Sequence, residues 1–198
     1  TYDLGRGYLL GSVPLGGIQR WTQRYLLLGD ASFRVEADYA HRYASAGLQA
    51  GLPIELGRGS ITPYAGVQAL QLDRDGFEEH GGLGLGLSTD ASTMKLSQGL
   101  VGARFAYDWL VGSSLWVLQG RAEWQHLLSQ SGGDIDARFS ALDVWSPIVG
   151  EALNRDVGVF GMSLGTKLGR ASRLSFDLDS RYSDGRQWTG ARATWSMG

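Results

Sequence analysis

The sequence predicts an all-β fold, an antiparallel up-and-down β-barrel, and three observations support this prediction. Apolar and polar residues alternate over long stretches, which is the side-chain period of a β-strand. Short segments with glycine and small polar residues, such as Leu56-Gly57-Arg58-Gly59, separate these stretches as tight turns do. No stretch of the 198 residues has the apolar period of an amphipathic helix.

The clearest alternation lies in the C-terminal part of the chain, over residues 173–183 and 190–197. Asp184-Gly185 between these two runs is a frequent hairpin turn. Charged residues occupy the middle of the polar face in both runs, and not only the strand ends. The two faces of this predicted hairpin therefore meet different surroundings, and the question is which solvent lies on each.

Six further strands are expected from the same pattern. The first, over residues 8–19, is poorly phased and contains Pro14, which weakens a strand. The others cover residues 46–54, 61–69, 101–109, 116–125 and 160–168. Short turns connect these runs at one end, and longer polar segments connect them at the other. The long loops are expected near residues 21–33, 73–82 and 129–156.

Three features indicate that the apolar face meets lipid and not a soluble core. Small residues, above all glycine, share the polar face with the charges, as a crowded interior requires. Short turns at one end and long loops at the other are typical of outer-membrane barrels. Closure into a barrel also removes the free strand edges that lipid does not tolerate. Aromatic residues on the apolar face gather at strand ends, as in membrane girdles: Tyr107, Trp109, Trp116, Trp124, Tyr182 and Trp195.

Composition excludes several other classes of protein. The formal net charge is −2, so nothing suggests a nucleic-acid surface. The absence of cysteine excludes a disulfide scaffold and a cysteine-ligated metal site. His41, His80 and His126 share no metal-ligand spacing. We therefore expect no cofactor and no small-molecule substrate. No signal peptide is visible, so it has been removed or the chain is a piece of a longer protein.

The segment Gly161-Met162-Ser163-Leu164-Gly165 fits the G-x-S-x-G pattern of an esterase nucleophile. That motif requires a strand-to-helix turn, followed later in the chain by an acid and a histidine. Here it lies inside a predicted strand, and the last histidine, His126, precedes it. Small residues on the interior face explain the pattern better, and we expect no enzymatic activity.

The charges on the polar face form the candidate site. One interpretation is a hydrated lumen whose electric field guides or holds a passing polypeptide. The other is a structural network of salt bridges that fills a polar interior, and both require the same barrel. The lumen-facing residues are expected to be Arg104, Asp108, Arg121, Glu123, Lys167, Asp177, Asp179, Arg181 and Arg192.

Several segments, taken in order, resemble a known family. They are Ile61-Thr62-Pro63-Tyr64-Ala65-Gly66-Val67-Gln68-Ala69-Leu70, then residues 99–107, 120–126 and 190–195. Each is degenerate alone, but their order and spacing together resemble the autotransporter β-domain of type V secretion. This resemblance covers most of the chain after Ala46.

The resemblance implies a twelve-stranded barrel in the Gram-negative outer membrane, which carries an N-terminal passenger to the cell surface. It also implies an α-helical linker in the lumen and insertion by the barrel assembly machinery. Residues 1–198 would form a single translocator domain that lacks its N-terminal strands and linker helix, because only about eight strands are expected. The family's C-terminal assembly signal usually ends in an aromatic residue, and here Met197 takes that place in the set Ala191, Ala193, Trp195 and Met197.

Two alternatives from other classes remain. A self-standing small outer-membrane barrel could serve as an adhesin or a structural anchor, because eight strands close a barrel filled by side chains. A soluble β-barrel binding module would need an apolar lumen, which Arg121 and Asp177 argue against. The expected partners are outer-membrane lipid, the barrel assembly machinery, and the passenger or linker helix.

Overall fold

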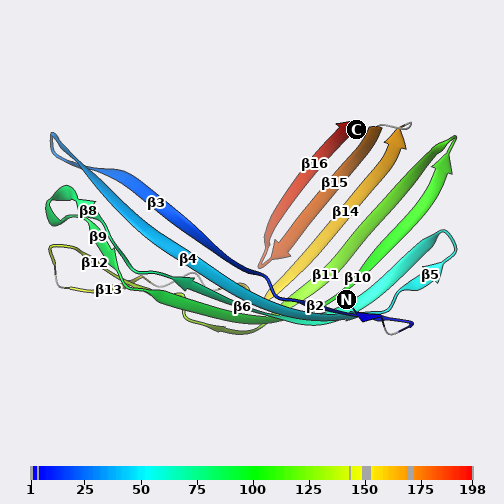
Figure 1. The fold of residues 1–198 in the computed structure, drawn as a ribbon, viewed down its shortest axis with the longest axis horizontal. Coiled ribbons are helices and arrows are strands. Elements are labelled where there is room, and N and C mark those ends of the chain that lie inside the picture. The colour runs from blue at the N-terminus through cyan, green and yellow to red at the C-terminus, as the bar shows by residue number, and fades with distance from the viewer. Residues whose placement is uncertain (1, 4, 143, 149–152, 169–171, 198) are drawn as a thin grey trace.

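The structure is a computed structural model that describes residues 2–3, 5–142, 144–148, 153–168 and 172–197. Its main feature is one long, curved antiparallel sheet (Figure 1). In the described residues, the neighbouring strands of this sheet are β1 (Tyr2–Asp3), β2 (Tyr8–Ser12), β4 (Ala31–Gly51), β6 (Gly59–Arg74), β10 (Ser92–Val111), β11 (Ser114–Ser131), β14 (Asp156–Leu168), β15 (Ser172–Ser183) and β16 (Arg186–Met197). Beside this path, β3 (Leu15–Leu28) and β8 (His80–Gly81) pair with β4, and β5 (Ile54–Leu56) pairs with β6.

The eight predicted strands are confirmed, in the predicted order. The first of them is divided at Val13-Pro14 into β2 and β3, and both pieces pair with β4. The turn after β14 was predicted at residues 168–172, of which 169–171 lie outside the described residues. The sheet is curved but not closed: β16 forms one edge, and β1, β2 and β3 form the other.

The expectation of a long loop near residues 21–33 is wrong. β3 and β4 continue to Leu28 and Ala31 and form one long hairpin, paired in register from Leu15↔Ala44 to Leu28↔Ala31. Its turn is Gly29-Asp30, and Gly29 has a φ of 61°, which glycine adopts without strain. The prediction failed because three consecutive leucines, residues 26–28, interrupt the alternation on which it depended.

The other two long connections fold together into a second sheet. Its strands, in order, are β13 (Ser146–Ile148), β12 (Ile135–Phe139), β9 (Leu87–Thr89) and β7 (Phe77–Glu78). A short 3-10 turn, η1 (Gly82–Gly84), lies between β8 and β9. Together with the β3–β4 hairpin tip, these segments form what we call the distal lobe. Figure 1 shows it at the opposite end of the molecule from β14–β16.

The distal lobe contains the most deeply buried apolar residue. Val35 of β4 is 0% exposed, and Ala37 and Ala137 are also buried. Gly82 packs so closely on Val35 that a Cβ atom at Gly82 would lie 2.6 Å from a Val35 methyl group. One apolar core therefore sits where loop segments cover the β3–β4 hairpin, and Tyr64 of β6 and Val159 of β14 are buried separately along the rest of the sheet.

The rest of the main sheet exposes large apolar side chains on one face, which we call the apolar face. Phe105, Phe160 and Phe176 are 37%, 41% and 48% exposed. The face begins at paired Trp109 and Trp116, whose ring centroids are 6.3 Å apart. Exposed apolar area this extensive marks an interaction surface such as a membrane.

The length of the apolar face fits a lipid bilayer. Along β11 it extends from Trp116 to Trp124, a separation of about 26 Å at roughly 3.3 Å per residue. A strand tilted by about 40° then spans roughly 20 Å, close to the apolar band of outer-membrane barrels. Within the described residues, no helix is both long and apolar enough to cross a membrane.

Candidate functional site

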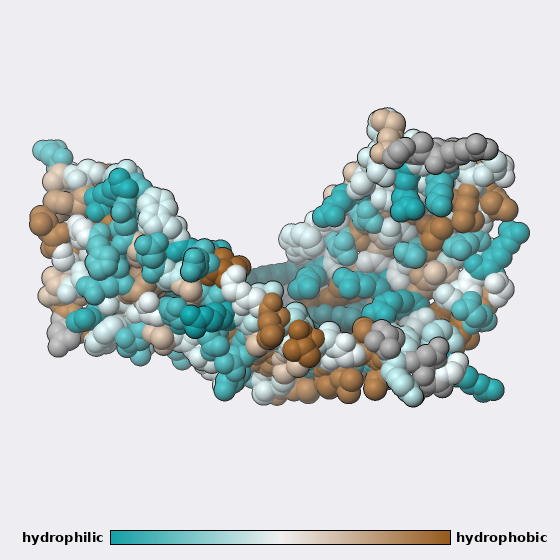
Figure 2. Space-filling view, in the orientation of Figure 1, coloured by the Kyte–Doolittle hydropathy of each residue, from teal (hydrophilic) through white to brown (hydrophobic). Residues whose placement is uncertain are grey.

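The candidate site is the other face of the main sheet, which we call the hollowed face. Figure 2 shows it as a hollow lined by hydrophilic side chains. Strand alternation and register place all nine predicted charged residues on it. In one lateral row, for example, Arg104 lies opposite Arg121, which lies opposite Gly161, and Gly161 lies opposite Asp179.

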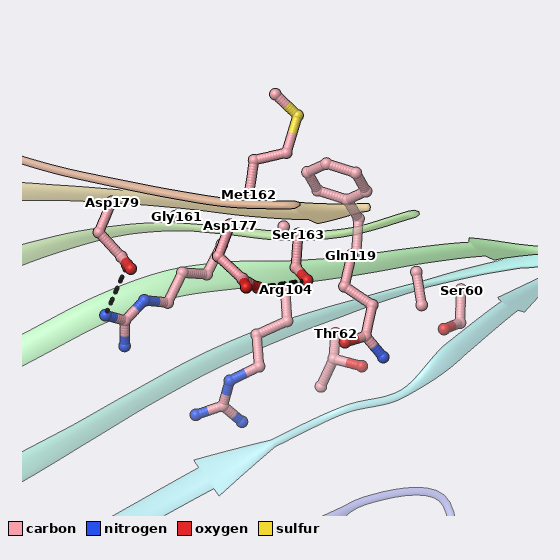
Figure 3. Close-up of a pocket in the computed structure, with 13 residues that line it drawn as sticks. Ser60, Thr62, Arg104, Gln119, Gly161, Met162, Ser163, Asp177 and Asp179 are labelled. Atoms are coloured by element: carbon pink, nitrogen blue, oxygen red, sulfur yellow. Dashed lines mark hydrogen bonds and ion pairs between the residues drawn. The ribbon is translucent and has the colours of Figure 1, made fainter. Parts of the chain in front are cut away.

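A hollow of about 420 Å³ lies over the middle of this face (Figure 3). Arg121 and Asp179 meet across it, with 3.8 Å between a guanidinium nitrogen and a carboxylate oxygen. Gly161 of the intervening strand makes room for this contact, because a Cβ atom there would lie 3.1 Å from the Asp179 carboxylate and 3.3 Å from Arg121. Both charged side chains remain about half exposed, so this ion pair contributes little stability.

Glu123 is bound by neutral donors. The Tyr64 hydroxyl donates to one of its oxygens at 2.7 Å, and the Gln125 side-chain amide donates to the other at 2.6 Å. Tyr64 reaches Glu123 from β6 by crossing Gly102 of β10, where a Cβ atom would lie 2.8 Å from the tyrosine ring. Tyr64 is itself only 4% exposed.

Arg104 is held in the same region by neutral groups. Its guanidinium stacks on the Tyr64 ring at 4.3 Å and donates hydrogen bonds to the Tyr8 hydroxyl at 3.0 Å and to Gln49 at 3.2 Å. Gln49 in turn donates to Tyr8 at 2.6 Å. This network links β2, β4, β6, β10 and β11, so polar contacts on the hollowed face tie five strands together.

The acidic side of the hollow lies on β15. The Ser163 hydroxyl donates to Asp177 at 2.7 Å, and Ser175 donates to the other carboxylate oxygen at 3.4 Å. Ser163 is the serine of the G-x-S-x-G pattern, and it lies inside β14 as predicted. Its hydroxyl donates to the Asp177 carboxylate and not to a histidine.

Of the predicted charges, only Arg121 and Asp179 form a direct ion pair among the described residues. Arg192 lies opposite Asp177 in register, but the two side chains do not form an ion pair. Arg181 lies opposite Trp188, which is uncharged. Among all the residues that the structure describes, no group of three or more histidine, aspartate or glutamate side chains could hold a metal ion.

Sequence reasoning missed four uncharged residues of the hollowed face. Tyr8 was overlooked because the first strand is broken at Pro14 and its facing could not be assigned. Gln49 had a usable signal, since it is in phase with Gly47 and Gly51 on the polar face of the strand predicted over residues 46–54. Tyr64 had a usable signal, since it is in phase with Thr62, Gly66 and Gln68 on the polar face of its strand. Trp188 was not assigned to any face, and it lies on the hollowed face of β16 in register with Arg181.

The predicted assembly signal lies on the apolar face of β16. Ala191, Ala193, Trp195 and Met197 pair in register with Leu178, Phe176, Leu174 and Ser172. Trp195 and Met197 are 64% and 70% exposed. They therefore form an accessible apolar stripe at the edge of the sheet.

The distal lobe holds a separate ion pair, whose carboxylate is buried and whose guanidinium is partly exposed. Arg24 of β3 donates to both oxygens of Glu79, at 2.7 Å and 2.5 Å, and the Leu87 amide donates to Glu79 at 2.7 Å. The Glu79 side chain is 8% exposed. The hydrogen bond from Arg24 lowers the pKa of Glu79, with a smaller contribution from the Leu87 amide, so this carboxylate is ionised at neutral pH.

Comparison with known proteins identifies the family. The family model for the autotransporter beta-domain matches residues 1–179. No curated protein matches the chain significantly. The family is a translocator barrel and not an enzymatic fold, and it resides in the outer membrane of Gram-negative bacteria. With an antiparallel sheet that is apolar on one face and charged on the other, the chain belongs to the autotransporter beta-domain family of type V secretion.

Proposed function

We propose that this chain forms the wall of an outer-membrane pore that carries a passenger polypeptide to the cell surface and then anchors it. The observation that supports this most is the division of the sheet into two faces. The apolar face is suited to lipid, and the hollowed face carries the charges, hydroxyl groups and glycines of a wet interior.

The chemistry of the hollowed face suits contact with a moving polypeptide. Arg104 and Glu123 are held by neutral groups, and Arg121 and Asp179 are separated by 3.8 Å. The Arg121–Asp179 pair in the hollow is long and about half exposed, so peptide groups of a passing chain can exchange with water there at little cost. The same contacts also brace the wall, so the guiding role and the structural role coexist.

The free edges of the sheet must be paired in a bilayer, because lipid offers no hydrogen bonds to the backbone. We infer that further strands pair with β16 and with the β2–β3 edge and complete a twelve-stranded barrel. A linker helix would then occupy the lumen. The apolar stripe Ala191, Ala193, Trp195 and Met197 on β16 is the segment that the barrel assembly machinery would recognise.

A second candidate function is that of a self-standing barrel acting as an adhesin or anchor. The distal lobe supports this candidate, because it has its own core around Val35 and an ion pair with a buried carboxylate. An adhesin of this kind would need no polypeptide in the lumen.

The experiment uses the complete natural polypeptide, with an epitope tag in the passenger that we propose it carries. Antibody binding to intact cells measures whether the passenger reaches the surface, and heat-modifiable gel migration measures whether the barrel is folded. We expect a surface-exposed tag and a folded barrel, and deletion of residues 186–197 should abolish both. A folded barrel whose tag remains in the periplasm would contradict transport and favour the self-standing anchor.

A further inference from the structure

Trp188 lies in a polar row of the hollowed face. Across the sheet, register aligns it with Arg181, Glu123 and Tyr64, and the same row ends at Tyr8 on β2. Three aromatic side chains therefore stand at one level of the wall, on the face that carries the charges.

The two tyrosines of this row are already engaged with the wall. Tyr64 lies over Gly102 and donates to Glu123, and Tyr8 lies over Gly51 and bonds to Gln49 and Arg104. Their rings are held against the neighbouring strands. They therefore leave the hollow open.

Trp188 differs from both tyrosines. It is 62% exposed, and its indole N–H has no hydrogen-bond partner among the described residues. One edge of its ring rests on Gly190, where a Cβ atom would lie 2.8 Å from the ring, so glycine allows the indole to lie along the strand. The wall thus supports the ring but leaves most of its surface uncovered.

We propose that Trp188 is a binding point for an apolar side chain of the polypeptide that occupies the lumen. An exposed indole in a polar passage offers a flat apolar surface on which aromatic or aliphatic groups pack favourably. The adjacent Arg181 keeps the surroundings hydrated, so the contact is local and reversible. This inference rests on the proposed transport function and adds to it a specific residue and a class of ligand side chain.

Photo-crosslinking in the outer membrane tests the proposal with the complete natural polypeptide. In one variant the photo-crosslinking residue benzoylphenylalanine replaces Trp188. In two further variants it replaces Gln119, which lies elsewhere on the hollowed face, or Trp195, which lies on the apolar face. We expect adducts with the upstream polypeptide from positions 188 and 119, and none from position 195. Adducts from 119 without adducts from 188 would overturn the role of Trp188 and leave the transport function standing. Failure at both positions would overturn the transport function as well.

Substitutions separate binding from mere proximity. With the crosslinker kept at position 119, Trp188→Ala should lower the steady-state yield of adduct about threefold to tenfold, the range expected for one lost aromatic contact. Trp188→Phe should restore most of the yield, because it keeps an aromatic face. Both variants should retain heat-modifiable migration. Equal yields from Trp188, Trp188→Ala and Trp188→Phe would overturn the proposal.

Discussion

The Tyr64 hydroxyl donates a 2.7 Å hydrogen bond to Glu123 across Gly102, so three strands meet in one contact. Gly102 lies on the middle strand, β10, and only a residue without a Cβ atom leaves room there for the Tyr64 ring. The contact also positions Arg104, whose guanidinium lies 4.3 Å above the same ring. A polar interaction at this point therefore organises the wall of the candidate lumen.

Adding a side chain at Gly102 should destabilise the barrel. In Gly102→Ala the new Cβ atom would lie 2.8 Å from the Tyr64 ring and 2.6 Å from the Ala122 carbonyl oxygen, so the ring or the backbone must move. We expect a loss of about 1–3 kcal/mol, as for other overpacked sites. The measurement is the temperature at which the folded band disappears from a heat-modifiability gel. Gly165→Ala is the matched control, because its nearest neighbour would be 3.8 Å away. Equal behaviour of the two variants would contradict the packing described for Tyr64.

Removing only the Tyr64 hydroxyl should have a smaller effect. Tyr64→Phe keeps the ring over Gly102 and the stacking on Arg104, but Glu123 loses one of its two neutral donors. A loss of about 0.5–1.5 kcal/mol is expected for one hydrogen bond. Unfolding in urea, followed by tryptophan fluorescence, measures it. Tyr107→Phe serves as the control on the apolar face, since its hydroxyl makes no hydrogen bond within the described residues. A loss in the control as large as that in Tyr64→Phe would show that the hydrogen bond is not the cause.

The strands and their faces could be predicted from sequence because each depends on a local period. Phe176 and Asp177 point to opposite sides of β15 wherever the strand lies in the sheet. The same period places the nine charges on one face of the sheet. The β3–β4 hairpin could not be predicted in the same way, because the leucines at residues 26–28 carry no alternation and pairing with β4 decides their conformation.

Contacts that depend on strand register or on segments far apart in the chain could not be predicted from the sequence. The Ser140 amide donates to Gly86, and the Asp90 amide donates to Asp136, so two loops far apart in the chain form one sheet. Likewise, the partner of Glu123 is Tyr64, a neutral residue 59 positions away, and not one of the arginines predicted nearby. Charge alone suggests that Glu123 pairs with an arginine. The space above Gly102 instead allows the Tyr64 ring to reach Glu123.

The assignment of faces predicts opposite responses to arginine on β10 and β11. Phe105 is on the apolar face with its ring over Gly120, and Gln119 lines the hollow. Phe105→Arg should cost roughly 2–4 kcal/mol near the bilayer midplane and prevent stable insertion. Gln119→Arg should be tolerated, because its guanidinium enters a wet interior. The amount of folded barrel in outer-membrane fractions measures both, and equal tolerance would mean that the faces are reversed.

The Arg24–Glu79 pair predicts that acid loosens the distal lobe. The hydrogen bond from Arg24 lowers the pKa of Glu79 in the folded lobe, so its stabilising effect is complete above the pKa of an unfolded glutamate, about 4.3. That effect is lost as pH falls through the lower folded pKa, because protonation removes the charge that Arg24 and the Leu87 amide bind. Hydrogen-exchange protection of the Leu87 amide should therefore decline below about pH 4. In Glu79→Gln, protection should already be reduced at pH 7 and should change little with acid, whereas Glu78→Gln, in the exposed neighbour, should behave like the native chain. If acid lowers the protection of the Leu87 amide equally in Glu79→Gln and in the native chain, a group other than Glu79 causes the effect.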